Sequence, residues 1–313
     1  MTDQTMMIDA LDSRVRRREE RRDFFRMATG AAAVTGAVMM GSAANAQAAP
    51  TDADIFNFAL NLEYLEAQFY SFAVFGTGLS NSLLTGTGTQ GPVTGGRQVP
   101  FTDPVVAQYA KEIAQDEIAH VIYLRNTLGA AAVAQPAIDV GTAPNGAFSS
   151  AARAAGLVGP GQSFDAYAND ENFLLGAFIF EDVGVTAYKG ASPLITSKVF
   201  LEAAAGILAV EAYHASVIRT TLYRKGVQTP ALRNATVAIS NARDSLDGST
   251  DLDQGIIGTS DTSNIAPLDS NGLAYSRTTG QVLNIAYLNR MAVDRGGFFP
   301  AGVNGTIRLS AAN

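Results

Sequence analysis

Two segments of the chain carry the same residue pair, a glutamate followed three positions later by a histidine. The pairs are Glu117-x-x-His120 and Glu211-x-x-His214, and they contain both histidines of the 313-residue sequence. Each lies in an alanine-rich apolar segment of helical character, where side chains three positions apart project from one face and can bind one metal ion together. A chain that uses both pairs at one site must bring two helices together, which restricts the fold strongly.

A second spacing is also repeated. Glu63 is followed seven residues later by Tyr70, and Glu181 is followed seven residues later by Tyr188. Each of these segments precedes one of the Glu-x-x-His segments, so the sequence contains two copies of one helix pair. The duplication predicts a pseudo-two-fold site, to which each copy supplies one Glu and one Glu-x-x-His.

Four long stretches have apolar residues at intervals of three and four. They predict helices over residues 51–75, 105–128, 164–188 and 194–224. Little β-pattern lies between them. We therefore predict an all-α fold, a four-helix bundle over residues 49–226.

The connections in this bundle are long. Residues 76–96 are rich in Gly, Thr and Ser, a composition that predicts a surface crossover outside the core, and residues 130–162 are expected to contain one short helix at most. Residues 227–313 are predicted to form a C-terminal extension packed on the bundle, with short helices over 231–246 and 278–288.

The four glutamates of the two repeats lie on apolar stripes of their helices, so their carboxylates are expected to point into the bundle. Burying a carboxylate without compensation costs several kcal/mol or forces it to protonate. Two divalent cations would balance four carboxylates, and two neutral imidazoles would complete the ligand set. A single Glu-x-x-His usually marks a solvated helix face. Two copies with matched inward glutamates favour a metal site.

Glu66 lies on the stripe next to that of Glu63, and three roles stay open for it. It is an additional ligand, a base beside the ligands, or an inward charge paired with Arg125 or Arg219.

Other polar residues beside the site have simpler interpretations. Tyr70 and Tyr188 are expected to pack in the core and hydrogen-bond a ligand carboxylate, rather than to carry a radical. Asp116 and Asp182 are adjacent to predicted ligands and so about 100° away around the helix. We interpret them as helix-surface charges.

The whole pattern resembles the ferritin-like superfamily, including ferritin, bacterioferritin, rubrerythrin and dimanganese catalase, over about residues 51–226. Within it, the segments 277–287 and 296–305 resemble secreted bacterial proteins related to plant desiccation-related proteins. The resemblance implies a centre of two iron or two manganese ions, at which Glu117 and either Glu181 or Glu211 would bridge. The implied ligands are Glu63, Glu117, His120, Glu181, Glu211 and His214.

Residues 1–48 are interpreted as a twin-arginine-type export signal, with Arg21-Arg22 before two phenylalanines, an apolar run from Met27, and small-x-small cleavage sites near Ala46. This predicts a periplasmic or secreted protein. No later segment is expected to span a membrane, because charge interrupts each apolar stretch.

Composition narrows the chemistry. The chain has no cysteine, which excludes disulfides, thiolate metal sites and iron–sulfur clusters, and its net charge of −7 argues against a nucleic-acid partner. One hypothesis is a redox enzyme acting on O₂ or H₂O₂, of ferroxidase, peroxidase or catalase type. The alternative is a non-catalytic stress or desiccation protein with a structural metal site. Iron storage is a third hypothesis with less support. The oligomeric state stays open.

Overall fold

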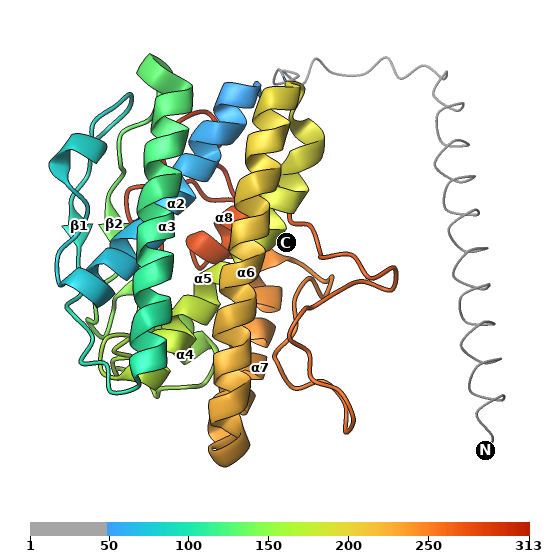
Figure 1. Ribbon diagram of the computed structural model, residues 1–313. Helices are drawn as coiled ribbons and strands as arrows, with labels where there is room; N and C mark the ends of the chain where they lie inside the picture. Colours follow the sequence, from blue (N-terminus) through green and yellow to red (C-terminus); the bar gives the residue numbers. More distant parts are fainter. Residues whose placement is uncertain (1–48) are drawn as a thin grey trace, which may run out of the picture. The chain divides into compact units, whose positions relative to one another are not determined.

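The computed structural model describes residues 49–313, so the predicted export signal over residues 1–48 lies outside the described part. Four long helices dominate the described chain (Figure 1). They are α2 (Asp52–Phe75), α3 (Pro104–Leu128), α5 (Asp170–Ala191) and α6 (Lys198–Gln228).

These helices begin and end where local chemistry satisfies their terminal backbone groups. Thr51 and Asp54 form a capping box at the start of α2, and Gly76 ends that helix in the left-handed conformation, with φ 73°. Asp103 accepts hydrogen bonds from two backbone N–H groups at the start of α3, where Pro104 occupies the first turn.

Two predicted helix boundaries were wrong. The third helix starts at Asp170 rather than near residue 164, because Asn169 caps it and Phe164 is buried in the preceding loop. The fourth starts at Lys198, capped by Ser197, and continues through Gly226 to Gln228. Leu194, where the predicted helix began, belongs instead to a separate 3-10 turn, Ser192–Leu194.

The helices pair as α2 with α3 and α5 with α6, and the two pairs pack into one bundle. Figure 1 shows α3 and α6 in front, with α2 and α5 behind them. This architecture confirms the all-α bundle. α6 is long and apolar enough to cross a membrane by length and composition, contrary to our expectation, yet it packs along α5 and places two predicted ligands in the bundle.

The crossovers contribute to the core, against the prediction for residues 76–96. Leu79, Leu84 and Val99 are buried in the same cluster as the helices. The two crossovers also meet in a small parallel ladder of β1 (Val93–Thr94) and β2 (Ile138–Asp139), and α4 (Ala147–Ala154) is the short helix expected in the second crossover.

The C-terminal extension contains α7 (Pro230–Asp247) and α8 (Thr279–Ala286), both in contact with α5. Side chains near its end reach the first helix of the bundle. Asn61 of α2 and Asn304 exchange two hydrogen bonds of 2.9 Å across 243 positions of sequence.

A buried network of ion pairs also joins the extension to the bundle. Arg219 of α6 donates to Asp182 of α5 at 2.7 Å, and Arg243 of α7 donates to the same carboxylate at 3.0 Å. Arg243 and Arg277 both reach a second carboxylate, on Asp253. Three arginines thus supply ion-pair partners to these buried aspartates, in place of the water that would solvate them at the surface.

Candidate metal centre

The six predicted ligands meet at the middle of the bundle, and all six are buried. Two overlapping sets have ligand atoms within 4.8 Å of one another. Glu117 is common to both sets, a position compatible with the bridging role that the resemblance implied for it. The first set is Glu63, Glu117, His120 and Glu211, and the second is Glu117, Glu181 and His214.

The two histidines lie on either side of Glu117. His120 Nδ1 is 3.5 Å from one oxygen of that carboxylate, and His214 Nδ1 is 3.0 Å from the other. His120 Nδ1 also lies 3.2 Å from Glu63 Oε2, and His214 Nδ1 lies 3.7 Å from Glu181 Oε2. Each imidazole thus presents the same nitrogen, Nδ1, to two carboxylates. One is the shared Glu117, and the other is Glu63 for His120 or Glu181 for His214.

Two tyrosines donate hydrogen bonds to the carboxylates of Glu63 and Glu181. Tyr70 of α2 donates a hydrogen bond to Glu181 of α5, and Tyr188 of α5 donates one to Glu63 of α2. Their placement agrees with the predicted role as packed donors to a ligand carboxylate. Each helix of the α2–α5 pair therefore orients the ligand of the other.

The electrostatics of the site are those of several carboxylates buried close together. Burial raises the pKa of Glu63 to about 7 and that of Glu181 to about 8. Burial would also raise the pKa of Glu117, but His120 and His214 on either side outweigh it and hold that pKa below its usual range. Protons on Glu63 and Glu181 would therefore neutralise charge that bound cations could neutralise instead.

Unsatisfied atoms at the site match the donor set of a metal centre. Among the described residues, both carboxylate oxygens of Glu117 and of Glu211, one oxygen of Glu181, and His214 Nδ1 are buried without a hydrogen-bond partner. Such groups are costly unless another partner is present. Carboxylate oxygen and imidazole nitrogen suit iron and manganese alike, so the residues fit a pair of either ion.

Glu66 lies outside both sets, and its suggested arginine partners are engaged elsewhere. Arg125 donates to the Tyr64 hydroxyl, and Arg219 donates to Asp182. The proposed ion pair of Glu66 with either arginine is therefore wrong. Its side chain is 6% exposed, and burial, together with the neighbouring carboxylates, raises its pKa well above the usual value.

The two aspartates predicted at the helix surface differ. Asp182 is buried in the arginine network, so that prediction was wrong. Asp116 is partly exposed as expected, but its Oδ2 lies 3.1 Å from His214 Nε2. A carboxylate on the outer nitrogen fixes the imidazole so that Nδ1 faces the site.

Gly184 is a site residue that sequence reasoning missed. A Cβ atom at this position would lie 2.0 Å from Glu211 Oε2, so only glycine leaves room for that carboxylate. Aligning α2 with α5 would have drawn attention to it, because Gly184 stands three residues after Glu181 where Glu66 stands three after Glu63.

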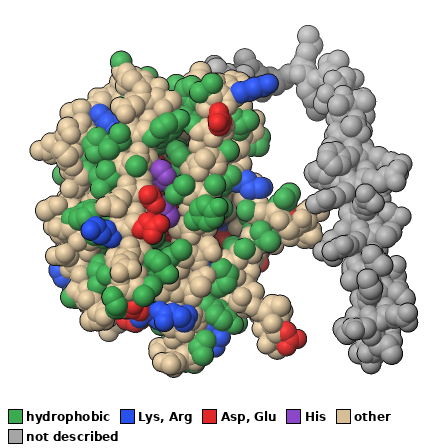
Figure 2. All heavy atoms as spheres, viewed as in Figure 1, with side chains coloured by type: hydrophobic (Ala, Val, Ile, Leu, Met, Phe, Trp, Pro, Cys, Tyr) green, Lys and Arg blue, Asp and Glu red, His purple; other side chains and the backbone are tan. Residues whose placement is uncertain are grey.

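The centre lies closest to solvent on the side of α3 and α6. Figure 2 shows the histidines between these two helices, with acidic side chains next to them. His120 is 8% exposed and His214 is 5% exposed, whereas the carboxylates of Glu117 and Glu211 are fully enclosed.

Comparison with known proteins agrees with this architecture. The sequence matches the ferritin-like domain family over residues 51–224. The desiccation-related protein PCC13-62 of Craterostigma plantagineum is 30% identical over 267 residues, which cover 82% of this chain and 83% of that protein. The ferritin-like catalase Nec2 of Nesocodon mauritianus is 28% identical over 268 residues, covering 82% and 84%. No solved structure gives a significant match. Both the family match and these relatives place the chain in the ferritin-like family, with desiccation-related proteins among its relatives.

Proposed function

We propose that this protein binds two iron or two manganese ions and decomposes hydrogen peroxide, converting two H₂O₂ into two H₂O and one O₂. The observation that carries the proposal is the shared Glu117, which joins two sets of buried ligand atoms, several of which have no hydrogen-bond partner. Adjacent ions that each change oxidation state by one supply the two-electron chemistry that this reaction needs. A relative named as a catalase supports this choice among O₂ and H₂O₂ reactions.

The protein's own groups would hold this centre in a fixed geometry. Tyr70 and Tyr188 orient Glu181 and Glu63, and Asp116 orients His214. Gly184 gives Glu211 its space. Burial of the carboxylates excludes bulk water, so their charges interact strongly with bound cations.

The test combines metal analysis with a peroxide assay on the full chain. Protein loaded with Fe²⁺ or Mn²⁺ is expected to hold about two ions per chain, because four carboxylates balance two divalent charges, and to release O₂ from H₂O₂. A Glu117→Ala, Glu211→Ala double variant should lose both properties. Glu112→Ala, at an exposed glutamate of α3, is the matched control and should lose neither. Folded protein without metal or turnover would refute the proposal.

A non-catalytic role is the second candidate, favoured by the similarity to a desiccation-related protein. In that case the ions would mainly neutralise buried carboxylates and stabilise the bundle. Metal would then raise the unfolding temperature without any consumption of H₂O₂ or O₂.

Export through a twin-arginine-type signal remains part of the proposal, with the mature protein in the periplasm or outside the cell. Changing Arg21 and Arg22 to Lys should retain the protein in the cytoplasm of a bacterial host, as measured by cell fractionation. An unchanged distribution would contradict this assignment.

A further inference from the structure

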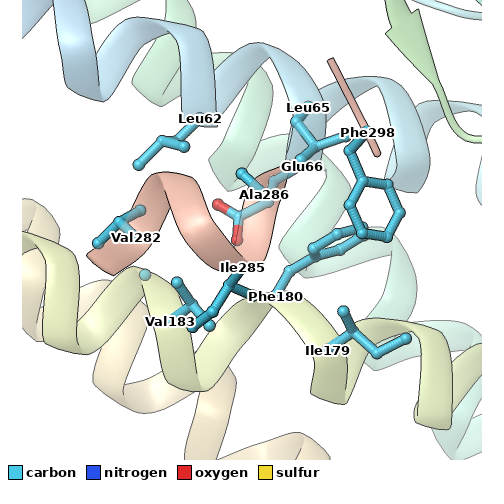
Figure 3. A pocket seen from close by; sticks show the side chains of 11 residues that line it. Leu62, Leu65, Glu66, Ile179, Phe180, Val183, Val282, Ile285, Ala286 and Phe298 are labelled. Atoms are coloured by element: carbon cyan, nitrogen blue, oxygen red, sulfur yellow. The ribbon is translucent and has the colours of Figure 1, made fainter. Parts of the chain in front are cut away.

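A small apolar cavity lies on the side of the centre away from the two histidines, between α2, α5 and the C-terminal extension (Figure 3). Leu62 and Leu65 of α2 line it, with Phe180 and Val183 of α5. The extension supplies Ile285 from α8 and Phe298. The space is about 30 Å³, enough for one or two water-sized molecules.

Glu66 is the charged residue of this lining. Figure 3 shows its carboxylate pointing into the cavity between aliphatic and aromatic side chains. The side chain is more than nine-tenths buried, and no other residue of the lining has a polar side chain. A buried carboxylate in such surroundings calls for a hydrogen-bond donor. The cavity is where a donor molecule has room.

The cavity directly adjoins the metal centre. Gly184 forms part of its wall, and the Glu211 carboxylate lies against this glycine, so close that a Cβ would be 2.0 Å from Oε2. On the α2 side, Glu66 is one helical turn from Glu63. A small molecule held by Glu66 would therefore lie next to the ligands of the ions.

We propose that this cavity is the peroxide pocket, in which H₂O₂ donates a hydrogen bond to the Glu66 carboxylate and Ile285 with Phe298 limits the size of the substrate. The inference rests on the proposed peroxide chemistry and adds to it a substrate class: hydrogen peroxide enters, and alkyl hydroperoxides do not. It also gives the C-terminal extension a role, as one wall of the pocket.

The size limit is tested by enlarging that wall. The rates at which H₂O₂ and tert-butyl hydroperoxide oxidise the reduced, metal-loaded protein in a single turnover are measured by stopped-flow absorbance. Wild type should react with H₂O₂ at least about tenfold faster. Ile285→Ala should raise the relative rate of the bulky peroxide about tenfold, because three carbons leave the lining. Leu283→Ala removes as many carbons from a buried position on α8 outside the lining, and should leave the ratio unchanged.

Two outcomes would overturn the pocket while leaving the proposed function intact. These are a wild type that reacts equally well with both peroxides, or an Ile285→Ala variant with an unchanged ratio and normal metal content. Failure of the wild type to bind metal or to react with H₂O₂ would instead count against the proposed function. If Ile285→Ala does not fold, Val282→Ala enlarges the same wall by less.

Glu66 itself is tested by Glu66→Leu. The variant should keep its metals but require more than about tenfold higher H₂O₂ for half-maximal turnover, because the acceptor is lost. Independently of activity, the metal-free variant should unfold at a temperature about 4 °C higher, since a buried carboxylate in an apolar lining is replaced by an apolar group. Unchanged H₂O₂ dependence, or a lower unfolding temperature, would show that Glu66 does not fill this role.

Discussion

The helix pairs α2–α3 and α5–α6 supply the same ligands but surround them differently. His214 has Asp116 at its outer nitrogen, whereas no hydrogen bond of His120 Nε2 is found in the described chain, and Val210 stands where α6 would need the matching carboxylate. Glu66 in one pair corresponds to Gly184 in the other. The repeat thus covers the types of the ligand residues but not their arrangement or surroundings, so the two halves of the site are inequivalent.

The matched arginines show the same divergence. Arg219 is fully buried and ties α6 to α5 and to the extension, while Arg125 is half-buried and donates to Tyr64 and to the backbone oxygen of Thr85. One helix pair is therefore enclosed by residues that follow it in the chain, and the other is enclosed by a crossover.

The largest expected effect follows from this contrast between arginines. Arg219→Met leaves Asp182 with one of its two arginine partners in a buried network, and should lower the free energy of unfolding by about 3–5 kcal/mol. Arg125→Met loses partly exposed hydrogen bonds and should cost about 1 kcal/mol. Urea unfolding of both variants measures the difference, and equal losses would refute the asymmetry.

Gly184→Ala tests the space that the second helix pair leaves for a ligand. The new Cβ displaces the Glu211 carboxylate, so metal affinity is expected to fall at least about tenfold. Gly206→Ala on α6 is the control, because its Cβ would meet no atom within 4 Å and alanine favours the helix by about 1 kcal/mol. Isothermal titration of the metal-free proteins with Mn²⁺ measures both; normal affinity in Gly184→Ala would contradict the steric argument.

Asp116→Ala should weaken metal binding at the position next to His214 more than at the position next to His120. Loss of the carboxylate that orients His214 is expected to reduce affinity about 10- to 100-fold at that position, so the metal content falls from about two ions toward one. Val210→Ala, at the matching place on α6, should retain both. Uniform loss of the two ions would mean that the positions are coupled rather than distinct.

The ligand set common to both halves predicts that stability depends on pH. Burial raises the pKa values of Glu63 and Glu181. At the two histidines burial alone would lower the pKa, but the nearby carboxylates outweigh this effect. They raise the pKa of His120 to about 11 and that of His214 to about 9. The folded metal-free protein therefore binds more protons than the unfolded chain, and its stability should fall between about pH 5 and 9.

Metal binding reverses this trend, because its ligands must be deprotonated. The gap in unfolding temperature between metal-loaded and metal-free protein should widen with pH over the same range. Calorimetry at several pH values measures it, and a gap that narrows would contradict the buried-carboxylate account.

The bundle and its six central residues could be predicted from sequence because both depend on spacing within single helices. Glu117 and His120 share a face whatever the rest of the chain does. Asp182 could not be assigned, because its partners on α6 and α7 are brought to it only by the tertiary fold. The same holds for Leu79 and Leu84, whose burial in a glycine-rich crossover depends on the helices they cover, and for Glu66, whose surroundings come partly from α8.

The bonds between Asn61 and Asn304 have a consequence for the order of events during synthesis. The first helix of the bundle cannot acquire its final neighbours until the segment around Asn304 has been synthesised, and contacts of such long range form slowly. Until then the carboxylates of the centre are accessible from the side that the extension later covers. Nascent chains would thus have an interval in which cations reach the glutamates freely, and docking of the segment around Asn304 would end it.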